Sequence, residues 1–126
     1  MRLLALLAGL ALGVSPAVAQ EVEPGTGAVL RGLDKVNGHV ADLDIASGGS
    51  AEFGRLLVEL VECRYPAGEP TSDAFAYMII RDKDGGTVRF TGWMMASSPA
   101  LNALEHPRYD IWVLRCSVPE AEAEEG

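Results

Sequence analysis

Apolar and polar residues alternate along much of the chain with a period of two, which is typical of β-strands that bury one face. The alternation is plainest in residues 39–45, where Ala41, Leu43 and Ile45 fall on one face. Turn-forming residues separate several such runs. The runs lie at residues 28–33, 39–45, 56–65, 74–81, 87–95 and 109–116. They predict a mainly β fold, a single small sandwich or barrel of about six antiparallel strands.

The run at residues 56–65 is the longest. Positions from Leu56 to Leu60 alternate onto one face, and those from Leu57 to Cys63 alternate onto the other. Because both faces are largely apolar, we expect a central strand that is covered on both sides. A helix is the alternative for this run, since Leu and Glu also favour helices.

Two hairpin turns are marked by their residue types. Asn37 and Gly38 predict a tight turn of type I′, because both residues tolerate a positive φ. Residues 82–86, with the sequence DKDGG, predict a longer hairpin with a charged turn.

One short helical turn is expected near residues 98–105. Ser98 suits the N-cap because its hydroxyl can accept from an unpaired N–H, and Pro99 suits the first helical position because it has no N–H. Leu101 and Leu104 lie three residues apart, so we expect them to pack on the same side.

The first nineteen residues have the parts of a secretory signal peptide. Arg2 supplies a basic start, and residues 3–14 form an apolar run shorter than the about 20 residues that a membrane-spanning helix needs. Ala17 and Ala19 fit the rule of small residues at the cleavage site, which predicts cleavage after Ala19. An uncleaved membrane anchor is the alternative. We therefore expect an exported protein with no membrane span after cleavage.

The rest of the chain divides into three parts. Residues 20–27 are polar and rich in Gly and Pro, which predicts a flexible lead-in. Residues 28–118 are expected to form the single β domain. Residues 119–126 carry four glutamates, which predicts a disordered acidic tail.

The charge balance limits the partners. Ten Lys and Arg residues stand against eighteen Asp and Glu residues, for a net charge of −8. Nucleic acids and anionic lipid surfaces are bound by basic surfaces, so neither is an expected partner.

The chain has two cysteines, Cys63 and Cys116. An even count in an oxidising compartment predicts one disulfide. Closing a loop of this length stabilises a fold by about 4 kcal/mol in the chain-entropy account. Two buried free thiols are the alternative.

A nucleophile, base and orienting acid can be sought in Ser97 or Ser98, His106 and Asp110. No G-x-S-x-G elbow holds either serine in the exposed position that a hydrolase needs. Ser98 is predicted to cap the helical turn, and His106 is predicted to bond the last carbonyls of that turn. We therefore assign no catalytic residue.

Metal and cofactor sites are also not expected. Residues 105–110 contain Glu105, His106 and Asp110 without regular ligand spacing, and His39 is remote in sequence. Residues 82–86 resemble the start of a calcium loop, but the position that needs a glutamate is Trp93.

The aromatic residues Trp93, Tyr109 and Trp112 are the remaining candidates for a binding site. Together they can line a groove for a ligand, a glycan or a protein partner. The alternative is a core role, since aromatic residues on strands often anchor small cores.

Residues 92–116 (GWMMASSPALNALEHPRYDIWVLRC) resemble the signature of the domain-of-unknown-function 2155 family. AVLRGLDKVNGHVADLDI and FGRLLVELVECRYP resemble its upstream pattern, so the likeness covers residues 28–118. The family usually has Phe where Met95 stands here. The resemblance implies a periplasmic all-β domain of Gram-negative bacteria with two cysteines and no assigned activity. Its genes often lie beside one for an accessory subunit of the respiratory NADH dehydrogenase, which implies a partner at or near the inner membrane.

We therefore expect a non-enzymatic periplasmic protein-interaction module, accessory to a respiratory membrane complex. The alternative is a periplasmic domain that binds a small ligand or glycan through an aromatic patch. A hydrolase acting through Ser97 or Ser98 with His106 is a third, less favoured hypothesis.

Overall fold

The computed structural model describes residues 21–119. The predicted signal peptide with its cleavage site and the predicted acidic tail from residue 120 onward lie outside the described residues. The described elements are β1 (Val22–Pro24), β2 (Gly27–Asp34), β3 (Val40–Ala46), β4 (Ser50–Phe53), β5 (Leu56–Pro66), β6 (Phe75–Asp82), β7 (Val88–Met95), the 3-10 turn η1 (Pro99–Leu101) and β8 (Tyr109–Ser117).

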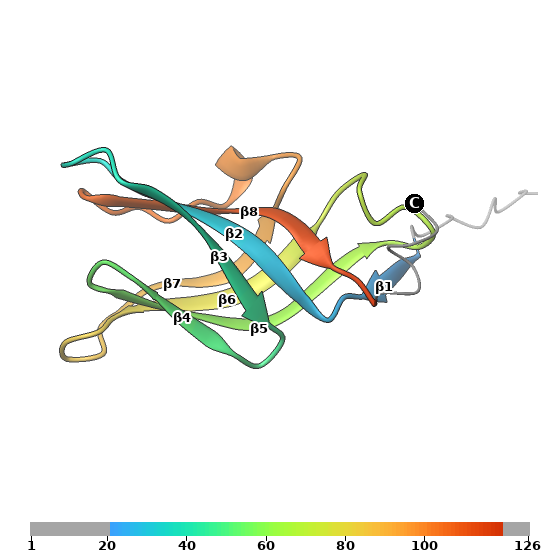
Figure 1. Cartoon of the computed structure of the whole chain (residues 1–126), viewed down its shortest axis with the longest axis horizontal. Coiled ribbons are helices and arrows are strands. Elements are labelled where there is room, and N and C mark those ends of the chain that lie inside the picture. Colours follow the sequence, from blue (N-terminus) through green and yellow to red (C-terminus); the bar gives the residue numbers. More distant parts are fainter. Residues whose placement is uncertain (1–20, 120–126) are drawn as a thin grey trace, which may run out of the picture.

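The strands form two antiparallel sheets that lie face to face, with β2, β3 and β8 in one layer and β4 to β7 in the other (Figure 1). In the larger sheet β5 pairs with β6, and β6 pairs with β7. The other edge of β5 pairs with β4 along its first half and with β1 at its end. In the smaller sheet β2 lies between β3 and β8. The predicted mainly β fold is confirmed as two separate sheets, and the described strands close no barrel.

The core lies between the two sheets. The predicted alternation in residues 39–45 is confirmed, because Leu43 and Ile45 of β3 are buried while their neighbours face outward. The smaller sheet adds Ala28, Leu30, Ile111 and Val113 to the core, and the larger sheet adds Leu56, Val58, Leu60, Met78, Ile80, Phe90 and Met94.

A β-bulge changes the face to which Cys63 points. Leu56 to Leu60 alternate into the core as predicted, but the pairing of β5 with β6 shifts register between Leu60 and Glu62. Val61 is the extra residue and is 46% exposed. A bulge of this kind inverts the alternation that follows it. Cys63 is therefore buried, and the predictions that it shares a face with Leu57 and that both faces of β5 are covered are wrong.

A second bulge does the same for Cys116 in β8. Consecutive residues of β2 pair with Val113 and Arg115, which leaves Leu114 as the extra residue. The prediction that Trp112, Leu114 and Cys116 share one face is therefore wrong. Val113 and Cys116 are buried, and Trp112 lies on the other face of the strand.

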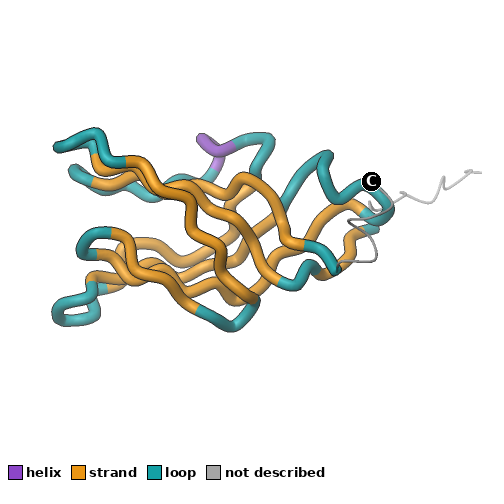
Figure 2. The backbone as a smooth tube through the Cα atoms, in the orientation of Figure 1, coloured by secondary structure: helices purple, strands orange, loops and turns teal. Residues whose placement is uncertain are grey.

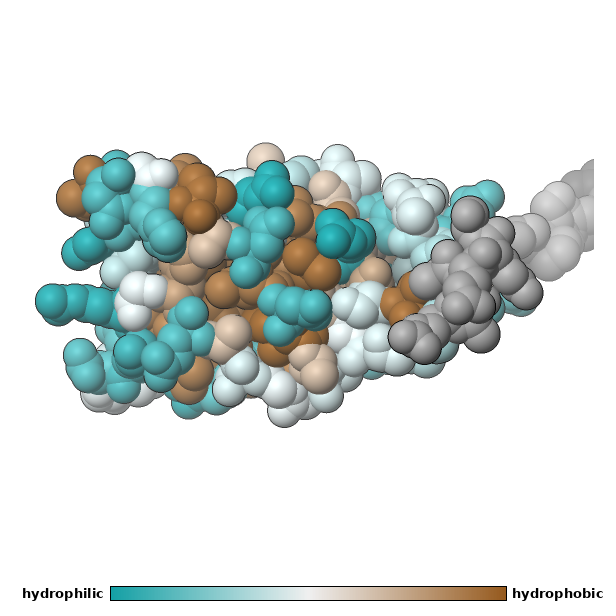
Figure 3. Space-filling model, in the orientation of Figure 1, coloured by the Kyte–Doolittle hydropathy of each residue, from teal (hydrophilic) through white to brown (hydrophobic). Residues whose placement is uncertain are grey.

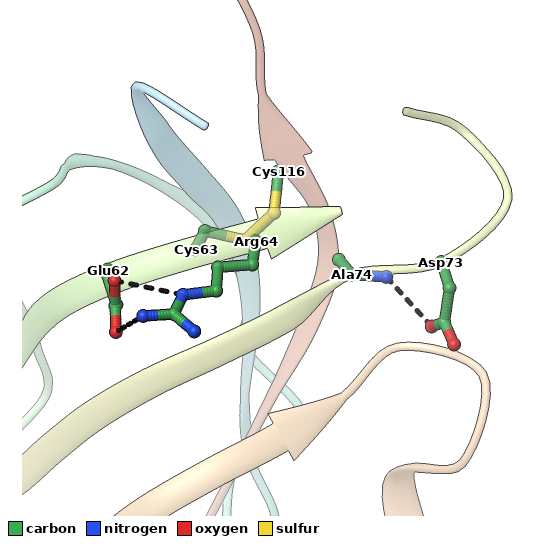
Figure 4. The surroundings of a disulfide bond; sticks show 6 residues. All are labelled: Glu62, Cys63, Arg64, Asp73, Ala74 and Cys116. Carbon is green, nitrogen blue, oxygen red and sulfur yellow. Dashed lines mark hydrogen bonds and ion pairs between the residues drawn. A yellow bond between two sulfur atoms is a disulfide. The ribbon is translucent and has the colours of Figure 1, made fainter. Parts of the chain in front are cut away.

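The two bulges bring the cysteines together. A disulfide joins Cys63 to Cys116 with 5.6 Å between the Cα atoms, as the even cysteine count predicts. Figure 4 shows this bond running from β5 to β8. It links the two sheets covalently near the C-terminal ends of β5 and β8.

The predicted flexible lead-in instead contains β1. Val22 pairs with Pro66 at the end of β5, and the Gly25 amide donates to the Cys63 carbonyl at 2.7 Å. A Cβ atom on Gly25 would lie 2.6 Å from the carbonyl oxygen of Ser117, so the segment passes close to both sheets. The polar composition of residues 20–27 gives no sign of a strand, because backbone hydrogen bonds between strands do not require apolar side chains.

The turn at Asn37 and Gly38 is not of type I′. Gly38 has a φ of +76°, but no described residue other than glycine has a positive φ. The buried Asp34 shapes a longer loop instead, since its Oδ1 accepts from the Val36 amide at 2.9 Å and its own amide donates to the His39 carbonyl at 2.8 Å. The predicted charged hairpin at residues 82–86 is confirmed between β6 and β7.

The predicted helical turn is confirmed in place but is shorter than expected. It consists of Pro99–Leu101, and the Ser98 side chain makes no capping hydrogen bond, contrary to prediction. Leu101 is 74% exposed whereas Leu104 is buried, so the two leucines do not pack together. None of the helical residues within 21–119 forms a segment long and apolar enough to cross a membrane.

Candidate functional site

The three candidate aromatic residues lie in three different settings. Tyr109 is 2% exposed and belongs to the core. Trp93 lies on β7 of the larger sheet and is 37% exposed. Trp112 lies on β8 of the smaller sheet, half-buried beside the segment that contains η1. The fold therefore does not join them into one patch, and Trp93 remains as the most exposed of the three.

Trp93 belongs to a surface that we call the outer face, the side of β5, β6 and β7 turned away from the core. The burial pattern alternates along these strands, so every second residue belongs to this surface except at the bulges in β5 and β7. The outer face consists of Leu57, Glu59, Glu62, Arg64, Phe75, Tyr77, Ile79, Arg81, Val88, Thr91, Trp93 and Met95.

The strand register places these residues in rows across the sheet. One row runs from Glu62 through Tyr77 to Trp93, and the next begins at Arg64 and ends at Met95. Directly opposed side chains on neighbouring strands are in contact distance of one another. The rows therefore gather apolar and aromatic side chains on β6 and β7, with charged residues on β5 beside them.

Trp93 is held in place on two sides. The Tyr77 ring meets it edge-on with 5.2 Å between the ring centroids, and the Arg64 guanidinium lies 5.4 Å from the indole centroid. The Asn102 side chain also donates to the Trp93 carbonyl at 2.9 Å. A shallow groove of about 340 Å³ opens beside the ring, lined by Val22, Arg64, Phe75, Trp93 and Met95.

The charged residues of the outer face are paired with each other. Arg64 binds Glu62 at 3.0 Å, and Arg81 binds Glu59 at 2.9 Å. Figure 4 shows the Glu62 and Arg64 side chains in contact beside the disulfide. The aromatic centre of the outer face is thus bordered by ion pairs whose charges cancel.

The serine and histidine candidates make separate contacts. Ser97 Oγ donates to Asp73 Oδ2 at 2.7 Å, and Asp73 Oδ1 accepts from the Ser97 amide. His106 Nδ1 accepts from the amides of Arg108 and Tyr109 at 3.0 and 3.2 Å, so the prediction that its ring bonds carbonyls is wrong. Among the described residues, no hydrogen bond joins a serine to His106.

The pKa of the His106 imidazole is lower than its ordinary value. Burial lowers the pKa of its imidazole, and the positive charge of Arg89 lowers it further. Asp82 opposes this shift, and Lys35 adds to it. A lowered pKa favours the neutral form of the ring.

The buried Asp34 is held by Arg108 through two of its guanidinium nitrogens, with the shortest contact at 3.0 Å. This hydrogen bonding lowers the pKa of the Asp34 carboxyl below its usual range. The pair joins the end of β2 to the start of β8 across 74 residues of sequence. Sequence reasoning passed over both residues, because neither belongs to a motif.

Residues 21–119 contain no group of three or more His, Cys, Asp or Glu side chains placed to hold a metal ion. His39 instead stacks on Phe53 with 6.0 Å between the centroids. Asp82, at the start of the charged hairpin, binds Arg89 at 2.8 Å.

The sequence profile of a bacterial family, described as "Uncharacterized protein conserved in bacteria (DUF2155)", matches residues 28–116. The chain belongs to this family. The match begins in β2 and ends at Cys116, so the DUF2155 region includes both strands that the disulfide joins. The DUF2155 family was also indicated by the resemblance of residues 92–116, which is confirmed.

The chain is also similar to the uncharacterized protein RP359 of Rickettsia prowazekii (strain Madrid E). It is 28% identical over 87 residues, which cover 67% of this chain and 56% of RP359. The chain thus spans little more than half the length of that relative. No solved structure matches the chain.

Proposed function

We propose that this DUF2155 protein is a non-enzymatic periplasmic interaction module that binds a protein partner through its outer face. The observation that carries the proposal is the exposed Trp93, fixed between Tyr77 and Arg64 on a regular sheet. Trp, Tyr and Met are enriched at the centres of protein interfaces, and charged residues are found at their rims. The outer face has this arrangement.

The rigidity of the Trp93 setting favours binding. A side chain that is already ordered loses less conformational entropy when a partner covers it, a cost that is otherwise about 0.5–1.5 kcal/mol for each immobilised side chain. The edge-on contact with the Tyr77 ring and the hydrogen bond from Asn102 to the Trp93 carbonyl both provide such order. The surrounding ion pairs add no net charge to the rim of this surface.

The partner is a protein at or near the inner membrane. The disulfide is compatible with export to an oxidising compartment. The resemblance of residues 92–116 supports a component of the respiratory NADH dehydrogenase as the partner.

Photo-crosslinking in cells tests the docking surface. A photoreactive residue at Thr91 lies on the outer face, whereas one at Val36 lies in the exposed β2–β3 loop. We expect a discrete crosslinked product from the Thr91 position, absent from the Val36 position and lost when Trp93→Ala is added. Equal products from both positions, or a Thr91 product that survives Trp93→Ala, contradict the proposal.

The groove beside Trp93 favours a second candidate function, a small-ligand or glycan binder. An exposed indole next to a shallow groove of about 340 Å³ is suited to stacking against a sugar ring. Trp112 lies in a different groove of about 310 Å³, so only Trp93 is assigned this role. Titration of the protein with soluble cell-wall fragments tests it: a saturable change in tryptophan fluorescence, absent in Trp93→Phe, supports glycan binding, and a flat response rejects it.

A further inference from the structure

A second concave site lies at one end of the sandwich, away from the outer face. The β4–β5 turn, the β6–β7 hairpin and the residues before β8 meet at this end (Figure 2). Figure 3 shows hydrophilic side chains gathered over the same end. They enclose a cleft of about 260 Å³, which we call the arginine cleft, lined by Arg55, Asp82, Asp84, Arg89, His106, Arg108 and Tyr109.

Arg55 lies in the arginine cleft with its backbone fixed and its side chain free. The Arg55 amide donates to the Tyr109 hydroxyl at 3.2 Å, and the Arg55 carbonyl accepts from the Lys83 amide at 2.8 Å. Within residues 21–119 the Arg55 guanidinium makes no hydrogen bond or ion pair. A guanidinium without a counter-ion is a ready binding group for an anion.

Arg89 and Arg108 are also oriented by their own partners. Each donates from Nε and Nη2 to one aspartate, Arg89 to Asp82 and Arg108 to Asp34, at 2.8 to 3.2 Å. This leaves the Nη1 group of each arginine without a protein acceptor among the described residues. A guanidinium that is already held in place keeps these remaining donors for a ligand.

His106 contributes a further donor. Because Nδ1 accepts from two backbone amides, the neutral ring carries its proton on Nε2. The cleft thus combines an unpaired arginine, two partly paired arginines and one imidazole N–H. Only Asp84, on the β6–β7 turn, brings an unpaired negative charge to the lining.

We propose that the arginine cleft binds the oxyanion group of a small molecule, a carboxylate or a phosphate. Forked guanidinium donors match the geometry of both groups. The size of the cleft admits a small molecule and excludes a folded domain. This site is independent of the outer face, and either can be correct without the other.

NMR titration of the full domain tests the proposal. Inorganic phosphate and acetate are added in separate arms at constant ionic strength, and sodium chloride alone is the third arm. We expect saturable shifts of the Arg89 and Arg108 Nε–H signals and of the Tyr109 amide signal with one oxyanion. The oxyanion that binds with the higher affinity shows whether the ligand carries a phosphate or a carboxylate. The proposal is overturned when neither arm saturates, or when chloride reproduces the shifts.

Three variants locate the site. Arg55→Gln removes the unpaired cation and is expected to weaken binding about fivefold or more, whereas Arg115→Gln, the same change on an exposed part of β8, leaves it unchanged. Asp84→Asn removes the opposing charge and is expected to strengthen binding about twofold. If Arg55→Gln and the unchanged protein bind the oxyanion with equal affinity, the assignment of the cleft is overturned. Asp84→Asn keeps Arg55, so its effect on affinity checks the location of the site independently.

Discussion

Removal of the disulfide is predicted to cost a large part of the stability of the fold. The Cys63–Cys116 bond closes a loop with a sequence separation of 53 and joins the two sheets. The chain-entropy relation gives about 4 kcal/mol for such a loop at 25 °C. Small domains have total stabilities of about 5–15 kcal/mol, so this contribution is decisive.

The corresponding change in melting temperature follows from the size of the domain. One kcal/mol shifts the midpoint of a domain of about 100 residues by about 4–8 °C, so loss of the bond lowers it by about 20 °C. Circular dichroism melts of the double variant Cys63→Ala, Cys116→Ala against the oxidised protein measure this shift. The reducing agent dithiothreitol is expected to lower the midpoint of the unchanged protein and to leave the variant unaffected. A loss below about 5 °C contradicts a contribution of about 4 kcal/mol from the bond.

Two further predictions concern the end of the sandwich that holds the arginine cleft. Gly54 has a φ of +56°, and a Cβ atom there would lie 2.5 Å from the Tyr109 hydroxyl oxygen, so Gly54→Ala is expected to destabilise the fold by about 2 kcal/mol in urea unfolding. The pKa of Asp34 is lowered by Arg108, so its contribution to stability is present above the unfolded pKa of about 3.9 and is lost as pH falls through the lower folded value. The urea midpoint of the protein is therefore expected to fall more steeply below pH 4 than that of Asp34→Asn, and parallel profiles contradict this.

The alternation of apolar residues is sufficient to predict most of the strands, but not the side to which each cysteine points. In β5 and β8 a single extra residue, Val61 or Leu114, reverses the alternation that follows it. A bulge depends on how two strands pair, and neither strand carries it in its own pattern. The pairing of Cys63 with Cys116 was nevertheless predictable from their number alone.

The candidate site was predictable only in part, for a related reason. Trp93 and Trp112 lie close in sequence, but β7 and β8 belong to different sheets, so the two rings do not share a surface. The rows of the outer face arise from the register of β5 with β6, which joins residues such as Glu62 and Tyr77. Sequence proximity could not reveal either arrangement, because both depend on which strands become neighbours.

In the short strand β1 and in the loop after β2, the residue types alone do not predict the local structure. Residues 22–24 contain Glu and Pro and still pair with β5, because the backbone of any residue can complete an edge. Asn37 and Gly38 match a hairpin dipeptide, but the buried Asp34 accepts from the loop amides and selects a longer turn. The residue types of these two segments do not predict their structure, because contacts with the rest of the fold outweigh the local preferences of the residues.

The proposed binding role of the outer face is tested most directly by the affinity of the purified protein for the periplasmic side of the inner membrane. Fluorescently labelled protein is titrated onto spheroplasts of the source bacterium, with Trp93→Ala and the control Leu101→Ala, which removes an exposed leucine from η1. We predict saturable binding that Trp93→Ala weakens at least tenfold, in the range of an interface hot spot, and that Leu101→Ala leaves unchanged. Binding that is equal for all three proteins contradicts the account.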